Sequence, residues 1–187
     1  ETKCVRGEIE EAIAINAIKR AASDYGKSTD DLTLPAEKKQ KVAVIGGGPA
    51  GIIAAHDLRR AGYKVTLYEA LDRLGGMMAV GIPEFRLPRH VLGKELEIIK
   101  KLGVEIKLNT RIGKDIRFDD IKKSHDAVFI AVGAHQGRSL GVENSSASGV
   151  IDGTEFLHKV NTGGKIAVTD KVVIVGGGNV AIDCART

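Results

Sequence analysis

Aromatic residues are scarce in this chain of 187 residues: they make up 4% of it, and tryptophan is absent. Proteins that bind single-stranded nucleic acid stack its bases on aromatic side chains, so no nucleic-acid partner is expected. The charge balance agrees, because 28 basic and 24 acidic residues are interspersed and leave a net charge of +4. The run Lys38-Lys39-Gln40-Lys41 is interpreted as part of a solvated linker.

Long apolar runs are missing as well. None approaches the roughly 18 residues that a membrane-spanning helix needs, and residues 1–20 are too polar for a signal peptide. The only two cysteines, Cys4 and Cys184, lie near opposite ends, which provides no disulfide framework and favours the reducing cytoplasm. With 43% hydrophobic residues, the sequence predicts a globular cytoplasmic protein of one large or two small domains, without a membrane partner.

Glycine, in contrast, is concentrated in turns that carry chemistry. Gly46, Gly48 and Gly51 have the spacing G-x-G-x-x-G, between an apolar β-branched run that predicts a strand and a stretch whose apolar spacing predicts a helix. In a dinucleotide site the first glycine allows a tight turn, the second lets the backbone approach a pyrophosphate, and the third brings the helix close to the strand. The helix N-terminus then offers free N–H groups to phosphates. A glycine-rich structural turn is the alternative.

An acidic residue and a glycine pair extend this prediction. A second expected strand, residues 63–69, ends in Glu69, at the distance of about 20 residues where a ribose-binding carboxylate is expected. Gly75 and Gly76 would let the backbone pass close to another part of the ligand. Arg86 follows on a proline-bounded loop, and its spacing leaves a surface charge and a phosphate ligand equally open.

The remaining pattern alternates between helix and strand. Residues 81–88 contain two prolines and predict an ordered extended loop, Met77 and Met78 are expected to pack, and residues 136–149 form a crossover or hinge. The expected helices are 7–25, which ends at Gly26, 89–102, a short segment around Ile121, and 154–160. The expected strands are 104–108, which is half-buried, 127–132, which is buried, and the strongly apolar 172–175.

The glycine turn occurs a second time. After the expected strand 172–175, Gly176, Gly178 and Ala181 have the spacing G-x-G-x-x-A and open another expected helix. One strand and one helix cannot bury their own apolar faces. The chain is therefore expected to be a fragment of a longer polypeptide; completion by a partner is the alternative.

Two dinucleotide turns in this order resemble the two-domain flavoprotein reductases, in which the first unit binds FAD and the second binds NAD(P)H. More specifically, the chain resembles the glutamate synthase small-subunit family, which includes the large subunit of NADH-dependent ferredoxin:NADP oxidoreductase and the N-terminal half of dihydropyrimidine dehydrogenase. The resemblance covers essentially the whole chain, and its most specific part is Ile-Pro-Glu-Phe-Arg-Leu-Pro. It rests on residues 74–76, 81–88, 126–134 and 176–183.

This resemblance implies an α/β, Rossmann-like FAD/NAD(P)-binding fold with an N-terminal helical segment and a truncated second unit. The expected domains are a helical tail of an iron–sulfur domain plus linker at 1–40, an FAD-binding domain at 41–150, and the start of an NAD(P)H-binding domain at 151–187. The implied flavin-domain contacts are Gly46, Gly47, Gly48, Pro49, Ala50, Gly51, Glu69, Ala70, Leu74, Gly75, Gly76, Arg86, Ile112 and Gly133. The implied contacts of the nicotinamide cofactor are Gly176, Gly177, Gly178, Asn179 and Val180.

Cys4 has two interpretations. On spacing alone it is a free thiol near a terminus. The resemblance places it where the last cysteine of an iron–sulfur cluster would lie, but its companions are absent, and such clusters need four protein ligands. A cluster is therefore expected only in the intact parent protein.

The activity implied by the resemblance is hydride transfer from NADPH or NADH to FAD, followed by electron transfer to iron–sulfur clusters and an electron-accepting partner subunit or domain. The cofactor carries this chemistry, so no catalytic acid, base or nucleophile is expected. A non-catalytic nucleotide-binding module is the main alternative. A nicotinamide-only dehydrogenase is weaker, because it has no use for the glycine pair or the Ile-Pro-Glu-Phe-Arg stretch.

Overall fold

A computed structural model describes residues 3–26, 32–137 and 140–187, and the chain divides into two compact units, 1–33 and 34–187. In the first unit, η1 (Val5–Glu8) is a short 3₁₀ helix and α1 (Ile15–Tyr25) is an α-helix that ends at Gly26. The prediction of one helix over 7–25 is therefore wrong between residues 9 and 14. Neither helix buries a residue, and helices without packing partners gain little beyond propensity, so the apolar spacing there does not extend the helix.

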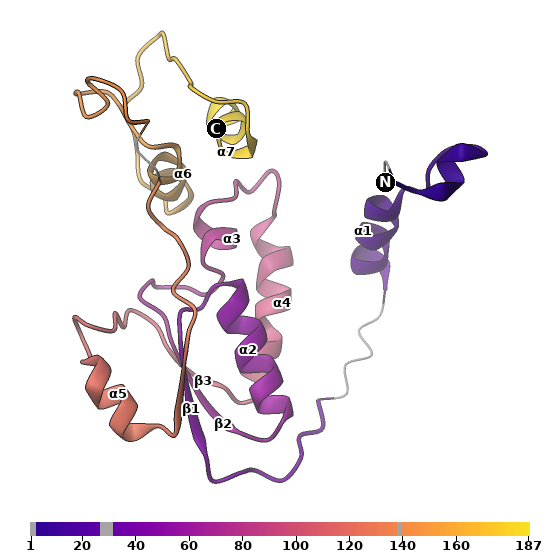
Figure 1. Ribbon diagram of the computed structural model, residues 1–187, viewed down its shortest axis with the longest axis vertical. Helices are drawn as coiled ribbons and strands as arrows, with labels where there is room; N and C mark the ends of the chain where they lie inside the picture. The colour runs from indigo at the N-terminus through magenta and orange to yellow at the C-terminus, as the bar shows by residue number, and fades with distance from the viewer. Residues whose placement is uncertain (1–2, 27–31, 138–139) are drawn as a thin grey trace. The chain divides into compact units, whose positions relative to one another are not determined.

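The second unit is built on a four-stranded parallel sheet in the order β3-β2-β1-β4 (Figure 1). The strands are β1 (Lys41–Ile45), β2 (Lys64–Tyr68), β3 (Glu105–Lys107) and β4 (Ala127–Ile130). Strand β1 lies in the middle, and its carboxyl end leads into the first glycine turn. This placement confirms the predicted α/β fold with parallel strands.

Helices cover both faces of the sheet. Helices α2 (Pro49–Arg60) and α4 (Arg89–Lys101) lie side by side in Figure 1 and pack on one face. The other face carries α5 (Phe118–Ser124), whose Ile121 is buried against Ala43 and Tyr68. The main core between the sheet and the first two helices contains Val44, Ile52, Ala55, Val65, Leu67, Leu74, Ile99 and Val104. Burial of these aliphatic side chains provides most of the driving force for this unit, at about 25 cal/mol for each Å² of apolar surface removed from water.

Strand β4 differs from its prediction in burial. It forms and pairs in parallel with β1, but Phe129 is 43% and Ile130 is 61% exposed. The reason is its position at the edge of the sheet, where β1 is its only partner among the described residues. An apolar run alone cannot distinguish a central strand from an edge strand.

The predicted strand at 172–175 is absent from the described structure, where these residues are extended and exposed, with Val173 at 87%. A strand exists only through backbone hydrogen bonds to a neighbour, and no described segment pairs with this one. The helix that follows does form, as α7 (Asn179–Arg186).

Two more helices connect these elements. Helix α3 (Met77–Val80), which the sequence did not predict, forms directly after the glycine pair, and both methionines pack as expected. Helix α6 (Gly153–Asn161) begins at Asp152, whose carboxylate accepts hydrogen bonds from the amides of Thr154 and Glu155 at 2.9 and 3.1 Å. In the parts of the chain that the structure describes, no helix has the length and apolarity to cross a membrane.

Candidate functional site

The first glycine turn has a backbone conformation that a residue with a side chain could not adopt. Gly46 has a φ of +109°, and a Cβ added there would lie 2.2 Å from the carbonyl oxygen of Ala131. A Cβ added to Gly51 would lie 1.8 Å from the carbonyl oxygen of Gly46. These two glycines therefore have the roles that the spacing predicts, a tight turn and a close approach of helix α2 to strand β1, whose Val44 side chain would lie 3.3 Å from the Cβ added to Gly51.

Gly48 has a different environment. It is the N-cap of α2, its backbone is extended, and the nearest atom to an added Cβ is the Cα of Gly76 at 3.8 Å. The fold therefore leaves space above Gly48 that a side chain would occupy. Helix α2 has no side-chain cap, and Pro49 is its first residue. This N-terminus, with its positive dipole end, is available to an anion.

The backbone of the glycine pair, Gly75 and Gly76, lies directly beside the first glycine turn. The amide of Gly75 donates to the carbonyl of Gly47 at 2.8 Å. A Cβ on Gly76, whose φ is +51°, would lie 2.7 Å from the Cα of Gly48. Leu74 is buried below them. Two backbone segments thus meet without side chains between them, as expected where a ligand lies against main chain.

Glu69 connects the first glycine turn to the segment that leads to the glycine pair. It is 6% exposed, and one carboxylate oxygen accepts from the amide of Gly47 at 2.7 Å while the other accepts from the amide of Leu71 at 2.8 Å. The sequence predicted a ribose-binding acid at this position but missed its hydrogen bond to the glycine turn. A buried carboxylate is tolerated only when its oxygens are satisfied, so Glu69 also holds the turn in shape.

Replacing Glu69 with glutamine should destabilise the second unit by about 1–3 kcal/mol, since the amide NH2 cannot accept and leaves one buried backbone N–H unpaired. Urea unfolding would measure this change. Glu95→Gln, at an exposed position on α4, is the matched control and should leave stability within about 0.5 kcal/mol. Equal stability of both variants would show that the Gly47 contact carries no energy.

Three other predicted contacts surround this turn. Ala70 lies directly after Glu69, whose carbonyl accepts from the amide of Thr110 at 2.8 Å, so that segment 109–112 runs beside it. Ile112 packs partly buried in the cluster of Ala43 and Tyr68. Gly133, with a φ of +68°, follows β4 close to the Ala131 carbonyl that faces Gly46. The fold therefore brings these three residues towards the carboxyl ends of the strands.

The second glycine turn repeats the backbone of the first. Gly176 has a φ of +124°, and Gly178, the N-cap of α7, has φ −79° and ψ 176°, against −79° and −175° at Gly48. Ala181 replaces the third glycine, and its Cβ lies 3.5 Å from the position of a Cβ added to Gly176. Around Gly177 and Gly178 nothing lies within 4 Å of an added Cβ. Asn179 and Val180 begin α7, so the five predicted residues lie on one exposed turn.

Arg86 contacts an acid that the sequence did not associate with it. Its Nη1 lies 3.0 Å from both carboxylate oxygens of Asp183 on α7. The loop that carries Arg86 is fixed by Arg89, which donates to the carbonyls of Met78 and Ile82 at 3.1 and 2.8 Å. This loop is not a helix, as its two prolines predict, but the prediction that it is extended is wrong: it turns at residues 84–86, where the amides of Arg86 and Leu87 donate to the carbonyl of Pro83 at 3.0 and 3.1 Å.

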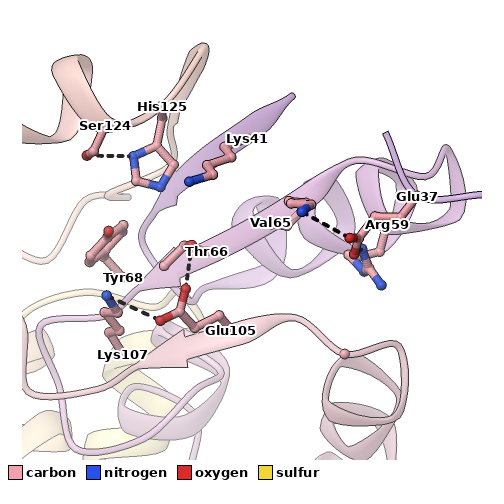
Figure 2. A pocket seen from close by; sticks show the side chains of 12 residues that line it. Glu37, Lys41, Arg59, Val65, Thr66, Tyr68, Glu105, Lys107, Ser124 and His125 are labelled. Carbon is pink, nitrogen blue, oxygen red and sulfur yellow. Dashed lines mark hydrogen bonds and ion pairs between the residues drawn. The ribbon is translucent and has the colours of Figure 1, made fainter. Parts of the chain in front are cut away.

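A hollow of about 460 Å³ lies elsewhere, over β2 and β3 on the face that also carries α5 (Figure 2). Its charged groups largely satisfy one another. Thr66 donates to Glu105 at 2.8 Å, and Lys107 lies 3.3 Å from the same carboxylate. These contacts, that of Thr66 first, lower the pKa of Glu105, whereas burial raises the pKa of Tyr68.

This hollow includes Lys41 and Lys64, the first residues of β1 and β2, and so extends to the amino ends of these strands. In open α/β sheets, ligands bind outside the carboxyl ends. We therefore take the glycine turns, and not the hollow, as the candidate site.

The described residues contain no group of three or more metal-ligating side chains. Cys4 is the N-cap of η1 and is partly exposed. Cys184 packs against α6, with its thiol 3.5 Å from the carbonyl of Gly153. Burial, and then the charges of Asp183 and Asp152, raise the pKa of the Cys184 thiol, so it is a poor nucleophile at neutral pH.

The fold and the two turns define a dinucleotide-binding α/β protein, and comparison with known families is more specific. The pattern of the family described as pyridine nucleotide-disulphide oxidoreductase matches residues 40–187. The chain belongs to this family.

Relatives of the chain are subunits of redox enzymes. It is 43% identical to the NADP(+)-dependent formate dehydrogenase subunit beta of Moorella thermoacetica, over 100% of this chain and 30% of the relative. It is 34% identical to the glutamate synthase [NADPH] small chain of Escherichia coli, over 100% of this chain and 43% of the relative. The chain thus spans less than half the length of either, and the small-chain likeness confirms the resemblance found in the sequence.

Among solved structures, 2-naphthoyl-CoA reductase in complex with 2-naphthoyl-CoA matches with a TM-score of 0.62 and 30% identity, covering 82% of this chain and 22% of that one. The chain therefore resembles this structure in the arrangement of its strands and helices as well as in sequence. The Rossmann-like class inferred from the sequence is therefore confirmed.

Proposed function

We propose that the chain is the nucleotide-binding part of an FAD-dependent NAD(P)H oxidoreductase that passes electrons to a partner subunit or domain. The observation that carries this proposal is the pair of glycine turns with the same backbone conformation, each opening a helix without a side-chain cap. Only the first is backed by a glycine pair and a buried acid. Two different nucleotides therefore fit the two turns better than two copies of one.

FAD is assigned to the first turn. The residues present fit its diphosphate, because the space above Gly48 is free of side chains and the uncapped α2 N-terminus offers N–H groups to the phosphate oxygens. Glu69 would accept from the adenosine ribose, with Ala70 and Ile112 at the adenine end. Leu74, Gly75, Gly76, Arg86 and Gly133 would complete the flavin side of the site.

The nicotinamide cofactor is assigned to the second turn, where Gly177, Gly178, Asn179 and Val180 would face its phosphates. NADPH and NADH are both candidates. The names of the relatives, which are subunits of a formate dehydrogenase and of a glutamate synthase, support a parent protein that works with an electron-accepting partner. An iron–sulfur cluster ligated in part by Cys4 belongs to the same proposal for the parent, which we place in the cytoplasm.

When bound, FAD supplies the ability to take two electrons as a hydride and release them singly. The chain's own residues bind and orient. The turns fix the diphosphates through backbone amides, Glu69 holds the first turn closed, and the boundary between the two nucleotide-binding domains is proposed near residue 150. No side chain is assigned a proton transfer.

The direct test is a visible spectrum of the 187-residue chain after addition of FAD and removal of the unbound excess. Retained FAD would show the flavin absorption bands, and anaerobic NADPH or NADH should bleach them if both turns act together. A chain that retains no FAD would contradict the first assignment.

A nucleotide-binding module without turnover is the second candidate. It is favoured by the exposure of the segment before the second turn, where Val173 is 87% and Val175 is 69% exposed. Such a segment does not anchor the turn to a sheet. Retention of FAD without bleaching by either nicotinamide nucleotide would select this module over the enzyme.

A further inference from the structure

The contact between Arg86 and Asp183 joins the two glycine-turn regions. Asp183 is in the middle of α7, the helix that the second turn opens, and it is only 5% exposed. Arg86 is on the loop that follows the glycine pair Gly75-Gly76 and α3, beside the first glycine turn. Its Nη1 lies 3.0 Å from both oxygens of the carboxylate. The interaction therefore spans 97 residues of sequence.

Neighbouring contacts reinforce this junction. The guanidinium of Arg186, one turn further along α7, lies 4.3 Å from the ring centre of Phe85. Helix α6 is attached to the same region through Asn161, whose amide donates to the carbonyl of Val80 at 3.0 Å. Because Cys184 packs against Gly153, α6 and α7 are also tied to each other.

The charge of Asp183 gives Arg86 a defined position. A buried carboxylate that loses its cation is strongly destabilised, and a hydrogen bond between two charged groups is about twice as strong as a neutral one. Arg86 uses only Nη1 for this contact among the described residues. Within the part of the chain that the structure describes, Nε and Nη2 make no hydrogen bond, so these donors would be available to a phosphate of the flavin nucleotide.

We propose that Asp183 is a positioning residue: it fixes Arg86, and the pair couples nucleotide binding at the second turn to FAD binding at the first. This inference rests on the proposed function. Ordering α7 by one nucleotide fixes Arg86 for the other. The effect is reciprocal, because each ligand must change the affinity for the other by the same factor.

The test is a fluorescence titration of FAD in the absence and presence of saturating NADPH, using the 187-residue chain. We expect NADPH to lower the Kd for FAD by about 5-fold or more, the lower end of common coupling strengths. Asp183→Asn should reduce this factor to below about 2-fold while it changes the Kd for FAD alone much less. Asp57→Asn, at an exposed position on α2, should keep the coupling of the native chain.

Amide hydrogen exchange on α7 tests the contact without any nucleotide. Arg86→Met and Asp183→Asn should each lower the protection of the α7 amides by about 10-fold, and the double variant should lower it no further. Unchanged protection, or coupling that survives Asp183→Asn, would overturn the inference. A chain that binds no FAD but loses α7 protection in both variants would refute the proposed function and retain the structural link.

Discussion

Gly48→Val should abolish tight FAD binding while the chain keeps its stability. The fold leaves room for the Cβ of the new side chain, since Gly48 is extended and an added Cβ would meet only the Cα of Gly76 at 3.8 Å. That same room is where the diphosphate would approach the backbone. We expect the Kd for FAD to rise about 100-fold or more, equivalent to about 2.7 kcal/mol, measured by quenching of flavin fluorescence.

Gly177→Val is the matched control. It also lies in a glycine turn with nothing within 4 Å of an added Cβ, but in the turn assigned to the nicotinamide cofactor. It should leave the Kd for FAD alone within about 2-fold. A similar loss in both variants would mean that the first turn is not the selective FAD site, and an unfolded Gly48→Val variant would mean that the space is needed for packing.

Gly51→Ala is the second large effect, and it concerns folding. The added methyl group would lie 1.8 Å from the carbonyl oxygen of Gly46 and 3.3 Å from the side chain of Val44. Helix α2 would have to move away from β1, in a core where packing is dense. We expect a loss of about 3 kcal/mol or more in the free energy of unfolding, measured by urea denaturation.

Gly93→Ala, on the neighbouring helix α4, should increase stability and so serves as the contrast to Gly51→Ala. Gly93 lies within α4, and nothing is within 4 Å of its added Cβ. Alanine should therefore raise the free energy of unfolding by about 0.5–1 kcal/mol, because it removes conformational freedom from the unfolded chain. If Gly51→Ala were as well tolerated as Gly93→Ala, the inference that α2 packs too closely at Gly51 to admit a side chain would be wrong.

Much of the fold was predictable because local patterns determine it. Gly46 and Gly51 were assigned a tight turn and a close helix approach from spacing alone, and the structure confirms both roles. Strands β1 and β2 and helices α2 and α4 also follow directly from apolar runs and their periods. In each case the residues that decide the conformation are neighbours in sequence.

The differences arise where distant residues decide. Phe129 and Ile130 belong to an apolar run, but their exposure depends on whether a strand pairs at the outer edge of β4. For residues 172–175 the apolar pattern is equally strong, yet no described strand pairs with them. Periodicity carries no information about the number of neighbours that a strand has.

Within the site, the sequence predicted which residues are present but not which groups they contact. Glu69 was expected to meet a ribose, and its position at the end of an apolar strand gave the only signal that its carboxylate would be buried. Its bond to the Gly47 amide depends on the turn geometry. Nothing in the sequence linked Arg86 to Asp183, because 97 residues separate them.

The central claim is that the backbone amides of the first glycine turn hold the diphosphate of FAD. Amide NMR of the chain labelled with ¹⁵N-glycine, which contains 23 glycines, tests this claim directly. On addition of FAD, the largest shifts should occur at Gly47, Gly48, Gly51, Gly75 and Gly76, while Gly113 and Gly149 stay unchanged. Shifts confined to Gly103, which lines the hollow of Figure 2, or the absence of shifts at the first glycine turn, would contradict it.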